Sequence, residues 1–134
     1  MKVIIDTNKL FSAALSKNGK IAQTLFSDEY EFIAPHFAMV ELFKYKDKLV
    51  VLTKKSEVEV LEILYLILLQ VNFFNEKSLS LSSRQAAYSL CKDIEPKDAI
   101  FIALSIELNA PLWTGDKKLK KGLSAKGFTH FFED

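Results

Sequence analysis

Short apolar runs alternate along the chain with longer segments in which apolar residues recur every three or four positions. Lys2–Ile5 is β-branched and almost continuously apolar, which is typical of a strand buried on both faces of a parallel sheet. Four more short runs predict strands at residues 30–34, 71–74, 112–114 and 129–132. Strands that alternate with helices predict right-handed crossovers. We therefore expect an α/β fold, a three-layer α/β/α domain around a five-stranded parallel sheet in the order 3-2-1-4-5.

Capping residues mark several helix boundaries. Ser56 followed by Glu59 is a capping-box pattern, and it opens a long apolar helix. Ser82 or Ser83 is expected to cap the next helix. Residues 35–48 keep helical spacing throughout, which predicts one uninterrupted helix.

Length and composition predict one globular domain over residues 1–134. This length is enough to close one buried core, and 49% apolar with 26% charged residues is ordinary for a soluble protein. A formal net charge of +1 gives no global attraction for polyanions, so nucleic-acid binding would need a local patch. The single cysteine, Cys91, excludes an internal disulfide, and two histidines leave no Cys/His set for a structural zinc ion.

No membrane association is expected. Asp6 interrupts the first apolar run too early for the hydrophobic region of a signal peptide. The longest apolar stretch, residues 63–71, is far shorter than the roughly 18 residues that mark a membrane-spanning helix. We therefore expect a cytoplasmic protein.

Three acidic residues occupy positions where an α/β fold builds binding sites. Asp6 closes the first predicted strand, and Asp116 follows the predicted strand at 112–114. Asp98 opens the apolar helix that begins after Pro96. Ligands of open parallel sheets bind at the carboxyl ends of the strands. Because gathered carboxylates raise one another's pKa, a cluster needs compensation, most commonly Mg²⁺ or Mn²⁺. The sequence therefore predicts a divalent-metal site.

The segments that carry these acids resemble the motifs of the PIN-domain nucleases. The matching segments are Ile4-Ile5-Asp6-Thr7-Asn8, Val40-Glu41-Leu42, residues 93–104 and Leu112-Trp113-Thr114-Gly115-Asp116-Lys117-Lys118-Leu119. The resemblance covers essentially the whole chain, and all four acids agree with it in order and spacing. It implies an endoribonuclease that depends on Mg²⁺ or Mn²⁺, often the VapC-like toxin of a toxin–antitoxin pair. The implied catalytic and metal-binding residues are Asp6, Glu41, Asp98 and Asp116.

The chemistry of these residues suits that implication. Hydrolysis of a phosphodiester needs a nucleophilic water and a neutralised phosphate, and one or two divalent ions supply both. Asp6 can bridge ions at its strand end, and Asp98 and Asp116 can complete their coordination. Glu41 can ligate an ion or take a proton from the water.

Three polar residues are secondary candidates. Asn8 can position the Asp6 carboxylate or contact substrate, although helix capping explains it equally well. Asp93 is either a fifth acid of the site or a helix cap. Thr114 is expected to hydrogen-bond an acid across the site if Trp113 packs into the core.

A lysine-rich helix follows Asp116 directly. Lys117 and Lys118 are the expected contacts to RNA phosphates, because phosphate contacts supply most sequence-independent affinity. A solvated helix face explains the same lysines without any partner.

The helix over residues 58–69 is apolar on more than one face, whereas a surface helix needs an apolar stripe of only about 100°. The apolar residues beyond this stripe either pack between neighbouring helices or form a surface for a homodimer or an antitoxin protein.

Other interpretations of the acids stay open at this point. Each acid taken singly can be a turn, cap or surface residue. A PIN-like RNA-binding module without activity would share the pattern, although such loss usually removes an acid and none is missing. A haloacid-dehalogenase-like phosphatase also opens with a strand and Asp, but it wants a second Asp where this chain has Asn8. A receiver domain would need a phospho-acceptor Asp where this chain has Asn75 and Glu76.

Overall fold

A parallel sheet lies at the centre of the molecule, which a computed structural model describes over residues 1–133. The strands are β1 (Lys2–Ile5), β2 (Glu31–Pro35), β3 (Val71–Phe74) and β4 (Leu112–Trp113). Within the described residues the sheet has four strands in the order β3-β2-β1-β4, and every pairing is parallel. Because all the strands run the same way, their carboxyl ends meet at one edge of the sheet.

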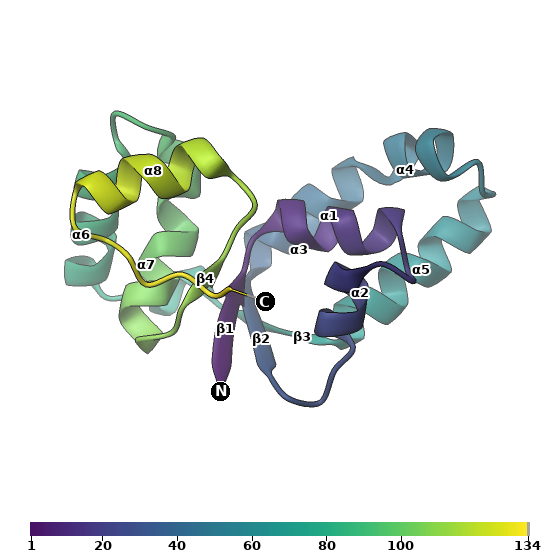
Figure 1. The fold of residues 1–134 in the computed structure, drawn as a ribbon, viewed down its shortest axis with the longest axis horizontal. Helices are drawn as coiled ribbons and strands as arrows, with labels where there is room; N and C mark the ends of the chain where they lie inside the picture. Colours follow the sequence, from purple (N-terminus) through teal and green to yellow (C-terminus); the bar gives the residue numbers. More distant parts are fainter. Residues whose placement is uncertain (134) are drawn as a thin grey trace.

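Helices cover both faces of this sheet and give three layers. The helices before the third strand are α1 (Thr7–Leu15), α2 (Lys20–Leu25), α3 (His36–Lys44), α4 (Lys46–Thr53) and α5 (Glu57–Leu69). Those after it are α6 (Leu81–Cys91), α7 (Ala99–Leu108) and α8 (Lys117–Ala125), with short 3₁₀ turns η1 (Glu76–Ser78) and η2 (Pro96–Asp98). In Figure 1, α6–α8 lie to the left of the sheet and α1–α5 to its right.

The core forms where the apolar pattern predicts it. Val3, Ile4 and Ile5 are fully buried, as expected of a strand that has neighbours on both sides. Trp113 of β4 packs against Phe32 of β2, with ring centroids 5.5 Å apart. Helix α7 is apolar on all sides and is accordingly buried between the sheet and α6. No helix among residues 1–133 is both long and apolar enough to cross a membrane.

The prediction of a fifth strand is wrong. Residues 129–132 make only an isolated parallel bridge, in which Phe131 is opposite Leu112. The bridge holds two backbone hydrogen bonds, from Leu112 N to His130 O and from Phe132 N to Leu112 O. It sits beside β4, at the place expected for the fifth strand. Because β4 has only two residues, it offers too little edge for a longer ladder.

Two predicted helix boundaries also need correction. The helix expected over 35–48 is broken at Tyr45, which separates α3 from α4. Tyr45 packs edge-on against Phe11 of α1, with ring centroids 5.5 Å apart, so a tertiary contact lies where the chain turns. The cap of α6 is Ser80 rather than Ser82 or Ser83, and its hydroxyl accepts from the backbone N–H of Ser83. The capping box of Ser56 and Glu59 is confirmed.

Candidate active site

The acidic residues gather in a pocket at the carboxyl edge of the sheet. The pocket has a volume of about 240 Å³. Its acidic lining residues are Asp6, Glu41, Glu95, Asp98 and Asp116. They come from the end of β1, from α3, from the turn before α7 and from the start of α8, so only the folded chain brings them together.

Asp6 lies deepest in this group. It follows β1 directly and is only 8% exposed. Its Oδ1 accepts from the backbone N–H of Lys9 at 2.9 Å and caps α1, so the capping role and the site role coexist in one carboxylate. Burial raises the pKa of Asp6, against the lowering effects of a hydrogen bond with the Thr114 side chain and of the Lys9 backbone and charge.

Asp98 has the clearest electrostatic signature of the site. It stands at the N-terminus of α7 but makes no capping hydrogen bond, so capping does not account for its side chain. Its pKa is raised to about 7, first by burial and then by the negative charges of the other pocket acids, Asp6 foremost. A nearby cation would stabilise the ionised form of such a buried carboxyl.

Asp116 and Glu41 complete the four predicted acids. Asp116 caps α8, because its Oδ1 accepts from the backbone N–H of Leu119 at 3.0 Å. Its own N–H donates to the Thr114 hydroxyl oxygen at 3.2 Å, which ties Asp116 to the end of β4. Glu41 is half-buried on α3 and lines the pocket from that helix. The charges of both acids contribute to the raised pKa of Asp98.

Sequence reasoning missed Glu95 as a pocket acid and considered Asp93 as either a fifth acid or a helix cap. Glu95 lines the pocket, and its charge raises the pKa of Asp98. Asp93 does not line the pocket; it forms an exposed ion pair with Lys126 and caps neither η2 nor α7. Pro96 could have pointed to Glu95, because the residue before a proline is restricted to an extended conformation and cannot continue a helix. Glu95 adopts φ −150° and ψ 92°.

The remaining predicted residues lie in or beside the pocket. Asn8 is part of its lining, and Thr114 is buried and supports both Asp6 and Asp116. Lys117 and Lys118 are exposed at the start of α8 and do not line the pocket. The structure therefore sets the two lysines next to Asp116, outside the cavity itself.

The other pocket walls were not predicted from the sequence. They are Thr7, Phe37, Tyr45, Lys97 and Phe101. Thr7 is 3% exposed, and its hydroxyl oxygen has no hydrogen-bond partner within the described part of the chain. Only the tertiary packing of α1, α3 and α7 assigns these side chains to the site.

The donor set of the pocket fits a hard divalent cation. Its possible ligands are carboxylate, amide and hydroxyl oxygens, with no thiol or imidazole among the described lining residues. Within residues 1–133 no three acidic, histidine or cysteine side chains are already drawn together as a metal cluster. The pKa of Asp98 is raised first by burial and then by the charges of the other pocket acids, and a bound cation would offset both effects.

Comparison with known proteins agrees with this geometry. The family model of the PIN domain matches residues 4–131. The chain belongs to the PIN-domain family. This PIN domain is also similar in fold to a chain of VapBC2 from Rickettsia felis, whose structure was solved with VapBC2 bound to a DNA fragment from its own promoter. The match has a TM-score of 0.63 at 18% identity and covers 90% of this chain and 92% of the other. No curated protein sequence matches the chain.

Membership in the PIN-domain family decides between the alternative interpretations of the acidic residues. The matched region contains all of the pocket acids, so the acids belong to the PIN domain and not to an attached segment. PIN domains are in general nucleases, which makes the pocket the expected place of phosphodiester chemistry. The PIN-domain match over residues 4–131 replaces the phosphatase and receiver-domain interpretations.

Proposed function

We propose that this PIN domain is a Mg²⁺- or Mn²⁺-dependent endoribonuclease that acts in the cytoplasm as the VapC-like toxin of a toxin–antitoxin pair. One observation carries the proposal: five acids from distant elements line one pocket, and burial together with the charges of the other four raises the pKa of Asp98 to about 7. A structural network would pair such charges with lysine or arginine. Lys97 is the only basic residue of the lining within the part of the chain that the structure describes.

In this proposal Asp6, Asp98 and Asp116 hold the metal, and Glu41 ligates it or accepts a proton from the attacking water. Bound divalent ions supply a water of lowered pKa and neutralise charge on the phosphate. Asp6 and Asp116 are held rigidly for this task, since each carboxylate also caps a helix. Thr114 orients Asp6, and Glu95 adds negative charge to the pocket.

The test of the proposal is a cleavage assay with matched preparations. Purified wild-type protein is incubated with a structured RNA in Mn²⁺, in Mg²⁺ and in EDTA, beside an Asp6→Asn variant prepared in the same way. Asparagine caps helices as well as aspartate does, so the variant keeps the start of α1. We expect metal-dependent cleavage by the wild type alone. Equal cleavage by both preparations, or none with any metal, would reject the nuclease and leave an inactive RNA-binding module.

Lys117 and Lys118 are proposed to bind the RNA backbone beside Asp116. Replacing both by glutamine in the cleavage-deficient Asp6→Asn background should weaken RNA binding for all sequences alike. The slope of log K against log salt should fall by about 0.7 for each single-strand phosphate that the protein no longer neutralises. Fluorescence anisotropy at several salt concentrations measures this slope. Lys54→Gln is the control, because Lys54 is an exposed lysine at the far end of α4. An unchanged slope in the double variant would contradict the assignment.

The antitoxin is the proposed protein partner. VapBC2 of Rickettsia felis, which this chain resembles in fold, was solved bound to promoter DNA, as expected of a toxin held by a DNA-binding antitoxin. Helix α5 exposes an apolar surface that a partner could cover, with Val58, Tyr65 and Leu69 each more than half exposed. A homodimer would use the same kind of surface. A neighbouring reading frame for a small DNA-binding protein would support the antitoxin.

A further inference from the structure

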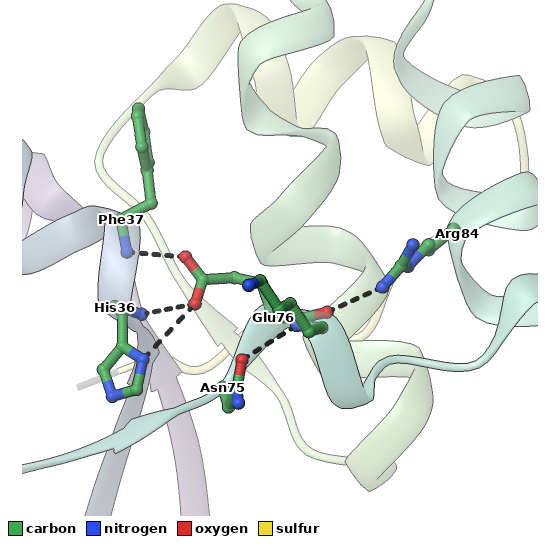
Figure 2. Close-up of polar contacts among 6 residues, drawn as sticks. His36, Phe37, Asn75, Glu76 and Arg84 are labelled. Carbon is green, nitrogen blue, oxygen red and sulfur yellow. Dashed lines mark hydrogen bonds and ion pairs between the residues drawn. The ribbon is translucent and has the colours of Figure 1, made fainter.

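The N-terminus of α3 is capped by a carboxylate from a distant part of the chain. Glu76 Oε2 accepts from the backbone N–H of Phe37 at 2.7 Å, and Glu76 Oε1 accepts from that of His36 at 3.1 Å. Figure 2 shows both carboxylate oxygens of Glu76 directed at the first turn of the helix. The residues joined in this way are 39 and 40 positions apart in the chain.

The local sequence leaves this helix without a cap of its own. The residue at the N-cap position is Pro35, which has no side-chain acceptor and makes no capping hydrogen bond. The first backbone N–H groups of a helix need an outside partner. A carboxylate is the strongest such partner, because it forms charge-assisted hydrogen bonds and faces the positive end of the helix dipole.

Glu76 is itself held in place by its neighbours. It begins the 3₁₀ turn η1 directly after β3, where Asn75 Oδ1 accepts from the backbone N–H of Lys77 at 3.0 Å. Arg84 of α6 donates from Nη2 to the carbonyl oxygen of Glu76 at 2.9 Å. Figure 2 shows Arg84 on the side of Glu76 that faces away from α3, and Asn75 below Glu76. The carboxylate therefore joins α3 to a turn that is fixed to both β3 and α6.

Helix α3 carries two walls of the acidic pocket. Phe37, whose N–H is one of the two bound by Glu76, lines the pocket, and Glu41 lines it one turn further along. Glu76 does not line the pocket. A shift or fraying of the first turn of α3 would therefore move both Phe37 and Glu41 relative to Asp6 on the sheet.

We propose that Glu76 is a positioning residue of the active site, which sets the place of Glu41 by fixing the N-terminus of α3. This inference rests on the proposed nuclease function for its catalytic meaning. The role is indirect, because Glu76 lies outside the pocket lining and acts through the backbone N–H groups of α3. Glutamine at position 76 keeps one carbonyl oxygen as acceptor, whereas alanine keeps none.

The test compares Glu76→Ala and Glu76→Gln with a matched control, Glu107→Ala. Glu107 is a second carboxylate that holds the start of a helix from a distant part of the chain: its Oε1 accepts from the backbone N–H of Ser80, the N-cap residue of α6, at 2.7 Å. None of the described pocket residues lies on α6. The control thus removes a similar hydrogen bond between a distant carboxylate and a helix start, at a helix that does not line the pocket.

We expect Glu76→Ala to lower kcat by about 10- to 100-fold, the range produced when a catalytic group is displaced from a distance. KM for the RNA should change little, and Glu76→Gln should recover part of the loss. Two further measurements do not depend on cleavage. Hydrogen exchange at the amides of His36 and Phe37 should quicken in Glu76→Ala, and Mn²⁺ binding measured by calorimetry should weaken. Glu107→Ala should leave all four quantities near their wild-type values.

Equal losses of kcat in Glu76→Ala and Glu107→Ala would overturn the proposal, because they would indicate a general loss of stability. Unchanged exchange at His36 and Phe37 would overturn it as well. If Glu76→Ala does not fold, the comparison of Glu76→Gln with Glu107→Gln replaces it. If the wild type cleaves no RNA with any metal, only the proposed nuclease function is rejected. Hydrogen exchange at His36 and Phe37, together with Mn²⁺ affinity, then decides whether Glu76 positions α3.

Discussion

Replacing Asp98 by asparagine is expected to lower RNA cleavage strongly and, at the same time, to stabilise the metal-free protein above neutral pH. The activity should fall by about two to three orders of magnitude or more, as for other groups that stabilise charge in a transition state. The gain in stability follows from the site's electrostatics. Burial and the surrounding acids raise the pKa of Asp98 to about 7. Asparagine carries no charge to repel.

The pH dependence of this effect has a defined sign. An unfolded Asp loses its proton near its model value of 3.8, whereas folded Asp98 keeps it until about pH 7. Between these values the native state binds more protons, so its stability falls as the pH rises and is lowest above pH 7. The full shift corresponds to at most about 4 kcal/mol. Because Asp98 is partly exposed, solvent screening reduces the expected gain to about 1–2 kcal/mol.

Urea unfolding in EDTA at pH 5 and pH 8 measures the effect. The advantage of Asp98→Asn over the wild type should be smaller at pH 5, where native Asp98 keeps its proton although the unfolded carboxyl has mostly lost its own, and should reach its full size at pH 8. Asp93→Asn is the matched control, since its ion pair with Lys126 lowers the pKa of Asp93 and its removal gives no gain at pH 8. A wild-type protein more stable than Asp98→Asn at pH 8 would show that the carboxyl is favourably paired instead.

Millimolar Mn²⁺ or Mg²⁺ is expected to raise the melting temperature of the wild-type protein. An ion that binds only the folded state at about 100 times its Kd adds about 2.7 kcal/mol of stability. For a chain of 134 residues this corresponds to a rise of roughly 10 °C. The rise should shrink at pH 5.5, because protons then compete with the metal for Asp98, and it should be small in Asp98→Asn.

Scanning calorimetry with and without metal measures this shift, and Na⁺ at matched ionic strength controls for screening of surface charge. A melting curve that ignores Mn²⁺ would count against a shared metal site. A shift of the same size in Asp98→Asn would place the ion elsewhere on the protein.

Several details could not be derived from the sequence, each for a physical reason. The apolar run at 129–132 predicts a fifth strand, but a strand needs a partner, and β4 is too short to provide one. The break at Tyr45 carries no glycine or proline signal, because a contact with Phe11 of another helix accompanies it. Glu95 takes the place in the pocket that was considered for Asp93, because Asp93 is paired with Lys126 outside it.

The alternation of strands and helices up to β4, the capping box at Ser56 and the position of Asp6 after a buried strand were determined by the sequence itself. These features follow local rules of periodicity, capping and burial, which act between residues close in the chain. Only the tertiary structure decided which acids share a pocket, that Asp98 lies in their combined field, and that Glu76 holds α3 across 39 residues. Electrostatic fields and long-range hydrogen bonds depend on distances in space, and no local pattern in the chain encodes them.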